Sequence, residues 1–329
     1  MDVVPRLAGD RDPSGVSALA LGTATLGNLL REMTDEQAWA ILEAAWEVGV
    51  RRFDTAPHYG LGLAERRLGE FLRTRPRDEY VVSTKVGRLL RPDPSWSGRL
   101  DVAQHYLVPA RLHRVWDLGA DGMRGSVEES LERMGLDRVD VVYLHDPERS
   151  GSLAAADEAA AALVRLREEG AAHEVGVASM TTSTLADFAR TGLLDVLMVA
   201  GRHTLLDQSA EVQVFPACRR HGTRVVAAAV FNSGLLSDAE PGPRSLFDYE
   251  PAPADMVERA LRIGAVCREL GVPVTTAALQ YPLRDPVVSY VVTGAAEPAH
   301  VRANAGALSR EVPGELWERL AHDGLVSPC

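Results

Sequence analysis

Short apolar runs alternate with longer segments of helical period along almost the whole chain. Eight runs are predicted as strands: residues 19–23, 51–55, 80–86, 140–145, 174–179, 196–200, 223–230 and 289–293. Continuous apolar stretches such as 225–230 are typical of parallel strands that are buried on both faces. Helices are predicted over residues 35–48, 64–73, 123–134, 154–169, 183–190, 209–220, 255–270, 298–307 and 313–322.

Eight strand–helix units predict an α/β fold, a single (β/α)8 TIM barrel, with residues 1–329 as one domain. The rival architecture is a doubly wound nucleotide-binding sheet, which normally has Gly-x-Gly-x-x-Gly directly after its first strand. Here the local Gly-x-Gly, Gly60-Leu61-Gly62, follows the second run and lacks the third glycine. No Pro-, Gly- or Ser-rich linker divides the chain, so the barrel is favoured.

Two long segments between predicted elements, 87–122 and 232–254, follow strands. A barrel would therefore place both at its C-terminal face. Loops of this length in a compact fold are usually functional lids or disordered. The first segment contains Trp96, His105, Tyr106 and Trp116, which favours a lid that lines a pocket.

The composition narrows the classes of partner. The net charge is −11, and an acidic chain without a basic cluster argues against nucleic acid and anionic membranes. No apolar run approaches the length of a membrane-spanning helix, and no secretory signal is visible. Cys218, Cys267 and Cys329 have no metal-ligand spacing and are predicted as reduced thiols of a cytoplasmic protein. Nothing indicates an oligomeric state.

Four polar side chains lie at or just after the ends of predicted strands: Asp54, Tyr59, Lys85 and His145. The C-terminal strand ends are where barrel enzymes place their chemistry. A free phenol has a pKa near 10, and a nearby ammonium group would lower it. The pattern thus predicts Tyr59 as a general acid/base, Lys85 with its counter-charge Asp54 as the pair that tunes it, and His145 as a donor to the substrate oxygen.

Other interpretations exist for each residue alone. A tyrosine on a loop is usually a packed aromatic, a buried Asp–Lys pair is usually structural, and a histidine that ends a strand is often a core residue. A metal site built from Asp54, His58 and His145 was the remaining alternative, but such hydrolase sites usually have further ligands at other strand ends. The conjunction of four groups at strand ends favours catalysis without a metal.

These residues resemble the aldo-keto reductase superfamily over about residues 14–326. The resemblance is carried by Leu21-Gly22-Thr23, Phe53–Gly60, Glu65–Gly69, Ser83–Gly87, Leu131–Leu136 with Asp140, and Leu144–Pro147. It implies hydride transfer to or from NAD or NADP, with Tyr59, Lys85, Asp54 and His145 in the roles given above. The nicotinamide would supply the hydride and the protein would supply position and a proton.

Within the superfamily the chain is most similar to the D-threo-aldose 1-dehydrogenase, or L-fucose dehydrogenase-like, branch. The segments that carry this are Gly201–Gln208, Val230–Leu236 and Ser83–Leu90. The resemblance implies oxidation of a sugar lactol at C1 to its lactone. Two alternatives remain open: an NAD(P)H-dependent reductase of an aldehyde or ketone in a biosynthetic pathway, and a nicotinamide-binding regulatory or subunit protein with little turnover.

The resemblance also implies a set of cofactor contacts, which comprises Thr23, Ser179, His203, Phe231, Asn232, Ser233, Gly234, Leu235, Gly294, His300 and Asn304. His203 stands where relatives stack a tyrosine on the nicotinamide. Ser179 is the polar residue left at the carboxamide position, since Met180 follows it. Residues 232–235 would wrap the pyrophosphate.

The segment 292–304 aligns with the clamp on the adenosine phosphate. Where NADP-preferring relatives have Lys, Ser and Arg, this chain has Gly294, Ala295 and His300. A phosphate needs cationic donors, and Glu297 nearby suits a free 2′-hydroxyl, so NAD is favoured unless Arg302 reaches the site. His58, Trp96 and Trp116 are expected to line the pocket for a small carbonyl or sugar substrate.

Overall fold

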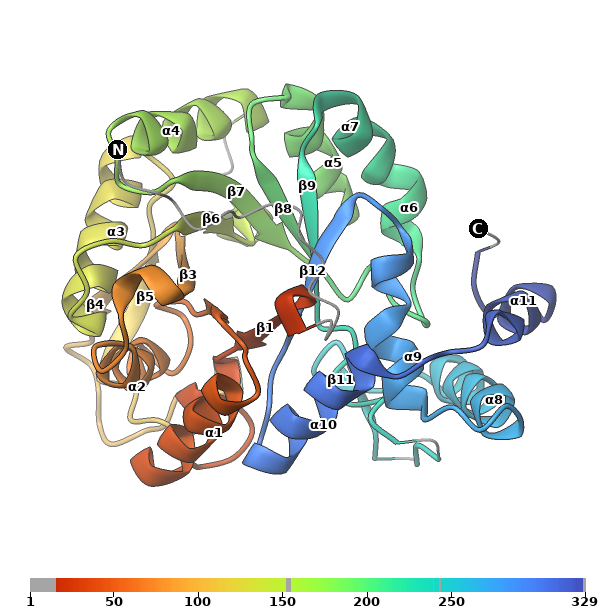
Figure 1. Ribbon diagram of the computed structural model, residues 1–329. Coiled ribbons are helices and arrows are strands. Elements are labelled where there is room, and N and C mark those ends of the chain that lie inside the picture. Colours follow the sequence, from red (N-terminus) through yellow and green to blue (C-terminus); the bar gives the residue numbers. More distant parts are fainter. Residues whose placement is uncertain (1–15, 152–154, 239, 243, 328–329) are drawn as a thin grey trace.

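The computed structural model describes residues 16–151, 155–238, 240–242 and 244–327. Eight parallel strands close into a barrel in the spatial order β1-β12-β9-β8-β7-β6-β3-β2 (Figure 1). The barrel strands are β1 (Leu19–Gly22), β2 (Arg52–Asp54), β3 (Val81–Val86), β6 (Val141–His145), β7 (Glu174–Ser179), β8 (Val196–Ala200), β9 (Arg224–Ala228) and β12 (Val288–Thr293). The predicted (β/α)8 barrel is therefore confirmed.

Helices surround the barrel. They are α1 (Asp35–Glu47), α2 (Leu63–Leu72), α3 (Ala120–Met134), α4 (Ala156–Glu168), α5 (Thr182–Thr191), α6 (Ser209–Gln213), α7 (Phe215–His221), α8 (Ala254–Glu269), α9 (Val274–Gln280), α10 (Pro298–Ser309) and α11 (Gly314–His322). Short 3-10 turns occupy Val16–Ala18, Ala24–Gly27, Arg77–Glu79, Val102–Gln104, Pro147–Ser150 and Pro282–Arg284. No helix in the described part of the chain combines the length and the apolar character needed to cross a membrane.

The start of α1 shows how local sequence sets an element boundary. The Thr34 hydroxyl accepts a hydrogen bond from the Gln37 N–H, and the Gln37 side chain accepts one from the Thr34 N–H. This reciprocal capping box satisfies donors that have no partner inside the helix. Thr34 is therefore the N-cap of α1.

Alternation along the strands separates two layers of core. Val141 and Tyr143 of β6 point into the barrel, where they pack with residues such as Met198. Val142 and Leu144 point outward into the main core between strands and helices. Since successive strand residues face opposite sides, this alternation also directs Lys85 and His145 toward the barrel mouth.

The structure differs from the predictions in three helices and in two hairpins within loops. The predicted helix 209–220 is two helices that meet at Val214, and α9 was not predicted. The loop after β3 contains an antiparallel hairpin of β4 (Arg88–Pro92) and β5 (Leu112–Trp116), and the loop after β9 contains β10 (Leu246–Phe247) and β11 (Glu250–Pro251). These pairings lie within loops, where local periodicity carries little signal.

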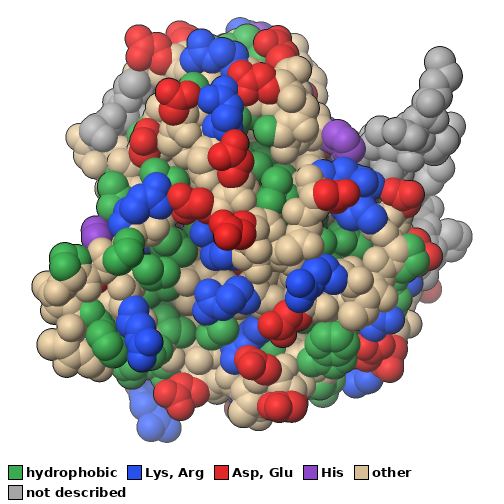
Figure 2. Space-filling model, turned by 90° about the vertical axis from the view of Figure 1, so that its left-hand side faces the viewer, with side chains coloured by type: hydrophobic (Ala, Val, Ile, Leu, Met, Phe, Trp, Pro, Cys, Tyr) green, Lys and Arg blue, Asp and Glu red, His purple; other side chains and the backbone are tan. Residues whose placement is uncertain are grey.

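The surface has mixed charge on the face shown in Figure 2, where acidic and basic side chains are interspersed. Cys218 and Cys267 are buried free thiols, and burial raises the pKa of both, to about 12 and about 11 respectively. Cys329 lies outside the described residues.

Candidate active site

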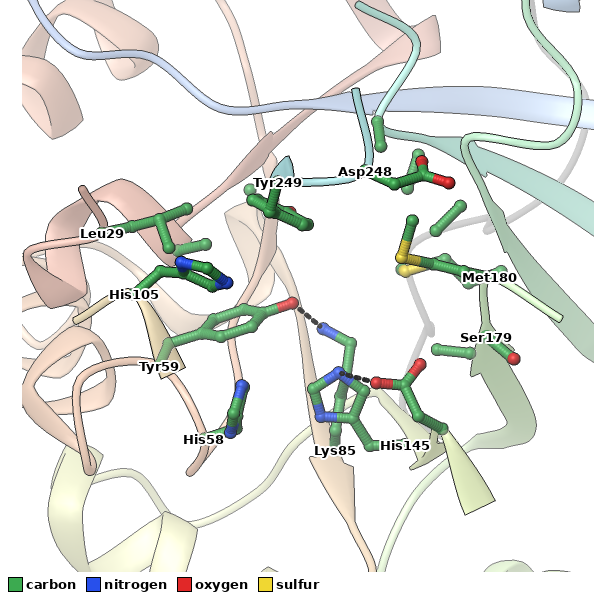
Figure 3. A pocket seen from close by; sticks show the side chains of 18 of the residues that line it. Leu29, His58, Tyr59, Lys85, His105, His145, Ser179, Met180, Asp248 and Tyr249 are labelled. Atoms are coloured by element: carbon green, nitrogen blue, oxygen red, sulfur yellow. Dashed lines mark hydrogen bonds and ion pairs between the residues drawn. The ribbon is translucent and has the colours of Figure 1, made fainter. Parts of the chain in front are cut away.

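A cavity of about 600 Å³ opens at the C-terminal ends of the barrel strands. Its lining combines strand ends with parts of both long loops, including His105 and Tyr106 from the first and Asp248 and Tyr249 from the second. Figure 3 shows Tyr59, Lys85 and His145 converging on its lower part. A cavity of this size suits a small-molecule or cofactor site.

Lys85 joins Tyr59 to Asp54. Its Nζ donates to the Tyr59 hydroxyl at 3.1 Å, to Asp54 Oδ2 at 2.6 Å and to the Thr55 carbonyl at 3.1 Å. The Ser83 hydroxyl donates to Asp54 Oδ1 at 2.7 Å. Because Lys85 is 2% exposed, its charge needs this carboxylate. The residues that the sequence predicted as one cluster therefore lie together.

A close backbone packing fixes the tyrosine. Tyr59 lies in the turn after β2, and its N–H donates to the Ala56 carbonyl at 3.1 Å. The next residue, Gly60, has a positive φ of 62°, and a Cβ there would lie 2.3 Å from the Gly27 carbonyl oxygen. Only glycine permits this approach without displacing backbone, so the Gly27–Gly60 contact sets where the phenol points.

Burial raises the pKa of the Tyr59 phenol well above its ordinary value of 10.0, and Asp54, Tyr249 and Asp146 raise it further. The sequence argument predicted the opposite net effect, with Lys85 lowering this pKa. That prediction is wrong for the cavity as it stands, because desolvation of a phenolate outweighs the neighbouring cations. Tyr59 is therefore a neutral phenol at pH 7.

Two histidines flank the phenol. The rings of His145 and His58 lie edge-on to Tyr59, with centroids 5.9 and 6.2 Å away, and 5.6 Å from each other. Burial lowers the pKa of both imidazoles well below 6.5, and the nearby Arg88 lowers them further. His145 is thus neutral at pH 7 and has one N–H to donate.

Two of the residues expected to contact the cofactor, Ser179 and Gly294, line the cavity. The Ser179 hydroxyl donates to Glu148 Oε1 at 2.6 Å and accepts from the Thr181 N–H at 2.8 Å. Thr23 is completely buried, and its hydroxyl donates to the Asp54 carbonyl at 3.0 Å. Thr23 therefore supports the strand end rather than lining the cavity.

His203 does not face the cavity. It is 3% exposed, its ring packs against Phe215 at 4.7 Å, and Nε2 lies 3.3 Å from the Pro282 carbonyl. The stacking role predicted for it is not compatible with this placement. The chain turns sharply after β8, so the preceding residue, Arg202, lines the cavity instead.

The segment 231–235 packs beside the cavity. Phe231 and Leu235 contribute to the core beneath α8 and α9. Asn232 donates to the Gly201 carbonyl at 3.4 Å, and the Ser233 hydroxyl accepts from the Tyr249 N–H at 2.9 Å. Gly234 is exposed. Ser233 thus holds Tyr249, which reaches the cavity.

Residues at the start of α10 and within it were expected to bind the adenosine end of the cofactor. His300 Nε2 lies 3.2 Å from Glu297, and Arg302 pairs with Glu47 at 2.8 Å. Asn304 donates to the Thr293 hydroxyl at 3.3 Å. Arg302 is thus turned toward α1 by a carboxylate.

Of the residues expected to line the substrate pocket, only His58 does. The Trp96 indole N–H donates to the Arg99 carbonyl at 2.9 Å, and Arg111 stacks on its ring. Trp116 stacks on Arg88 and faces a neighbouring cavity of about 550 Å³. The hairpin β4–β5 carries both tryptophans away from the barrel mouth.

The lining fits a nicotinamide cofactor. Small residues form part of the wall at Gly22, Ala228, Ala229 and Gly294. A Cβ at position 294 would meet the Thr25 side chain and the Gly22 carbonyl oxygen at 3.7 and 3.8 Å, which is ordinary van der Waals contact. Asn232 Oδ1 is buried and has no hydrogen-bond partner among the described residues. The described residues contain no cluster of His, Cys, Asp or Glu able to hold a metal ion.

His105 and Tyr106 line the cavity, as expected for a first loop that lines a pocket. Three further lining residues were not predicted: Arg202, Asp248 and Tyr249. The His105 and Tyr249 rings stack at 6.0 Å across the two long loops. Arg202 donates to both oxygens of Asp248, at 3.2 and 2.5 Å. Aromatic residues in the first loop were a usable signal, whereas nothing in the second loop's sequence placed Tyr249 over the barrel.

Comparisons with known proteins agree with this geometry. The profile described as "Aldo/keto reductase family" matches residues 18–322. A D-threo-aldose 1-dehydrogenase from Pseudomonas sp. is 49% identical, over 94% of this chain and 95% of the relative. A pyridoxal 4-dehydrogenase from Microbacterium luteolum is 36% identical, over 95% of each chain.

A solved aldo-keto reductase from Bacillus halodurans, in its holo form, superposes with a TM-score of 0.72 at 24% identity, over 94% of this chain and 92% of that one. At this identity the likeness shows the fold alone. The matching profile and the two curated relatives establish more. The chain belongs to the aldo/keto reductase family and is an NAD(P)-dependent oxidoreductase.

Proposed function

We propose that this protein oxidises the lactol form of an aldose at C1 to the lactone, with NAD⁺ as the acceptor. The observation that carries the proposal is the position of Lys85 Nζ, which bonds both Tyr59 and Asp54 beside His145 in an open cavity. The similarity to a relative named D-threo-aldose 1-dehydrogenase supplies the substrate class.

Tyr59 is the group that exchanges the proton. In the oxidation, the C1 hydroxyl loses its proton to the deprotonated phenol oxygen, and C1 loses a hydrogen with its bonding electron pair as the C1–O bond becomes a carbonyl. The bound nicotinamide supplies the acceptor for that hydrogen and electron pair. The neutral His145 N–H donates to the C1 oxygen and orients it.

Lys85 favours the deprotonated phenol through its charge, and Asp54 supplies the counter-charge that a buried ammonium group needs. The reverse reaction uses the neutral phenol as the acid. Since burial raises the pKa of Tyr59, oxidation is expected to accelerate with rising pH and reduction to be favoured near neutrality.

The cofactor would be held by Ser179, Arg202 and Gly294 at the cavity and by Asn304 of α10.

The preference for NAD⁺ follows from the charges at α10. Glu297 and His300 pair with one another, and Arg302 is engaged by Glu47. A 2′-phosphate would meet a carboxylate there, which is unfavourable, whereas a 2′-hydroxyl can donate to it.

A spectrophotometric screen tests the proposal. NAD⁺ and NADP⁺ are each incubated with a panel of aldoses, and the reverse reaction is run with NADH or NADPH and simple aldehydes. We expect aldose-dependent reduction of NAD⁺, with lactone as the product. No turnover of any aldose, together with efficient reduction of simple aldehydes, would replace the proposal by a carbonyl reductase.

A further inference from the structure

One carboxylate at the cavity has no role in the chemistry described so far. Asp146 follows His145 directly and adopts a left-handed backbone conformation, with φ 40° and ψ 56°. Its N–H donates to the Ala178 carbonyl of β7 at 2.8 Å, which holds the turn. Non-glycine residues pay about 1 kcal/mol or more for this conformation. The turn places a carboxylate at the end of β6, on the lining of the cavity.

A buried arginine fixes that carboxylate. Arg88 donates to Asp146 Oδ2 at 2.5 Å, and its guanidinium stacks on the Trp116 ring at 4.6 Å. Both side chains are largely buried, 5% exposed for Arg88 and 15% for Asp146. Burial raises the pKa of Asp146, and Arg88 opposes that rise. Held between an aromatic face and the carboxylate, Arg88 keeps Asp146 oriented and favours its ionised form.

The two oxygens of this carboxylate differ in their surroundings. Arg88, His145 and Arg149 all approach Oδ2, the latter two at 3.7 and 3.8 Å (Figure 3 marks the His145 contact). Within the described residues no contact is recorded for Oδ1. An ionised carboxylate only accepts hydrogen bonds, so Oδ1 is an acceptor that awaits an O–H or N–H donor at the cavity.

Asp146 does not act by orienting His145. Their separation of 3.7 Å exceeds a hydrogen bond, and the imidazole is neutral at pH 7, so no ion pair forms. The neighbouring Glu148 differs, because one of its oxygens accepts a hydrogen bond from Ser179 and the other is buried without a hydrogen-bond partner among the described residues. Arg149 is 60% exposed, and its recorded ionic contact among the described residues is the 3.8 Å approach to Asp146. Asp146 is thus an acceptor that is held in place beside the imidazole.

We infer that Asp146 is a specificity-determining residue, which accepts a hydrogen bond from the hydroxyl on the carbon next to the reacting one, the 2-hydroxyl of an aldose. This rests on the proposed function. His145 holds the C1 oxygen, and Asp146 lies one hydrogen-bond reach beyond it. Vicinal hydroxyls present two oxygens at such a spacing. His145 and Asp146 would therefore bind the C1 and C2 hydroxyls at the same time, and substrates that lack the second hydroxyl would be disfavoured.

The test compares two sugars that differ only there. 2-Deoxy-D-ribose has the configuration of D-arabinose at every remaining stereocentre of the chain and lacks the 2-hydroxyl. Wild-type kcat/KM is expected to favour D-arabinose by about 10- to 100-fold, the range for one hydrogen bond to a charged group. This comparison requires no variant and therefore stands even if a substituted protein fails to fold.

Asp146→Asn then removes the charge while keeping the shape. We expect kcat/KM for D-arabinose to fall about tenfold or more relative to that for 2-deoxy-D-ribose, so that the preference nearly disappears. Any general effect, such as a changed pKa of Tyr59, acts on both sugars alike and cancels in the ratio. Asp248→Asn is the matched control, because that carboxylate also lines the cavity but has both oxygens bound by Arg202; its ratio should stay within about twofold of wild type.

The outcomes separate the inference from the proposal beneath it. Wild-type enzyme that oxidises both sugars equally well, or an Asp146→Asn variant that keeps the full preference, overturns the inference and leaves the aldose dehydrogenase standing. Wild-type enzyme that oxidises neither of these sugars nor any other aldose of the screen overturns the proposed function itself. A preference for D-arabinose that is lost in Asp146→Asn and kept in Asp248→Asn supports both.

Discussion

Replacing Asp54 by Asn should lower the apparent pKa of the catalytic phenol. The Asp54 carboxylate is bonded to Lys85, which is bonded to Tyr59, so its charge lies within about 6 Å of the phenol oxygen. Asp54 raises the pKa of Tyr59, and removing the charge therefore stabilises the phenolate. At an effective dielectric constant near 20 the lost repulsion is about 3 kcal/mol, or about two pKa units.

The apparent pKa falls in Asp54→Asn whether Tyr59 or Lys85 gives up the proton. Without the Asp54 carboxylate, the Lys85–Tyr59 pair can release a proton in two ways. Either Tyr59 ionises and its phenolate pairs with the Lys85 ammonium, or the ammonium itself gives up the proton. The two states carry the same number of protons in one hydrogen-bonded pair, so both lower the macroscopic pKa of that pair. The same substitution leaves a buried ammonium poorly compensated, and the free energy of unfolding should fall by about 3–5 kcal/mol.

The assay is the pH dependence of kcat/KM for aldose oxidation. Below the pKa of the base the logarithm of kcat/KM rises one unit per pH unit, and the profile levels off above it. Wild-type enzyme should keep rising to strongly alkaline pH, whereas Asp54→Asn should level off about two units earlier. Ser83→Ala is the control, because it removes a hydrogen bond to the same carboxylate while keeping its charge; its shift should be well under one unit. A profile in Asp54→Asn that levels off at the wild-type pH, or later, would refute the electrostatic argument.

Three further predictions follow from the same site. Tyr59→Phe should reduce turnover by at least about a hundredfold while the dissociation constant of the cofactor stays nearly constant, and an equal loss of cofactor binding, measured by fluorescence titration, would assign Tyr59 a structural role. Glu297→Lys should improve kcat/KM with NADP⁺ relative to NAD⁺ by about tenfold or more; an unchanged ratio in steady-state kinetics would place the 2′-position elsewhere. Gly60→Ala should lower the free energy of unfolding, measured by denaturant titration, by more than about 2 kcal/mol, because the alanine Cβ would collide with the Gly27 backbone. Gly98→Ala, also at positive φ but with open space around its Cβ, should cost only the smaller backbone strain of about 1–2 kcal/mol.

The catalytic cluster was predictable because a closed parallel barrel brings the C-terminal ends of all its strands to the same rim. Val141, Tyr143 and His145 share one strand face, as do Ser83 and Lys85, so an alternating pattern with polar ends directs those ends to one rim. Only the order of the strands around the barrel was then needed to bring β2, β3 and β6 together, and consecutive units of this fold are neighbours. The four residues were therefore found by periodicity together with the resemblance.

The remaining cavity residues depend on turns that follow the strands. His203 and Arg202 are adjacent in sequence, yet Arg202 lines the cavity and His203 is buried. The turn after β8 decides between them, and no periodic pattern extends past the last strand residue. The helix α9 was missed because its first turn, Val274-Thr275-Thr276, consists of β-branched residues. Such residues have a low helix propensity, and tertiary packing overrides that preference here.

Local residue patterns thus established the barrel, the faces of its strands and the acid–lysine–phenol set, since each of these depends on spacing along one element. The assembled molecule decided which loop residues cover that set and how strongly they desolvate it. The His105–Tyr249 stack joins the two long loops, and the resulting burial reverses the pKa shift expected for Tyr59. Desolvation is a sum over all neighbours in space, so residues distant in the chain contribute to it, and spacing along one strand cannot reveal it.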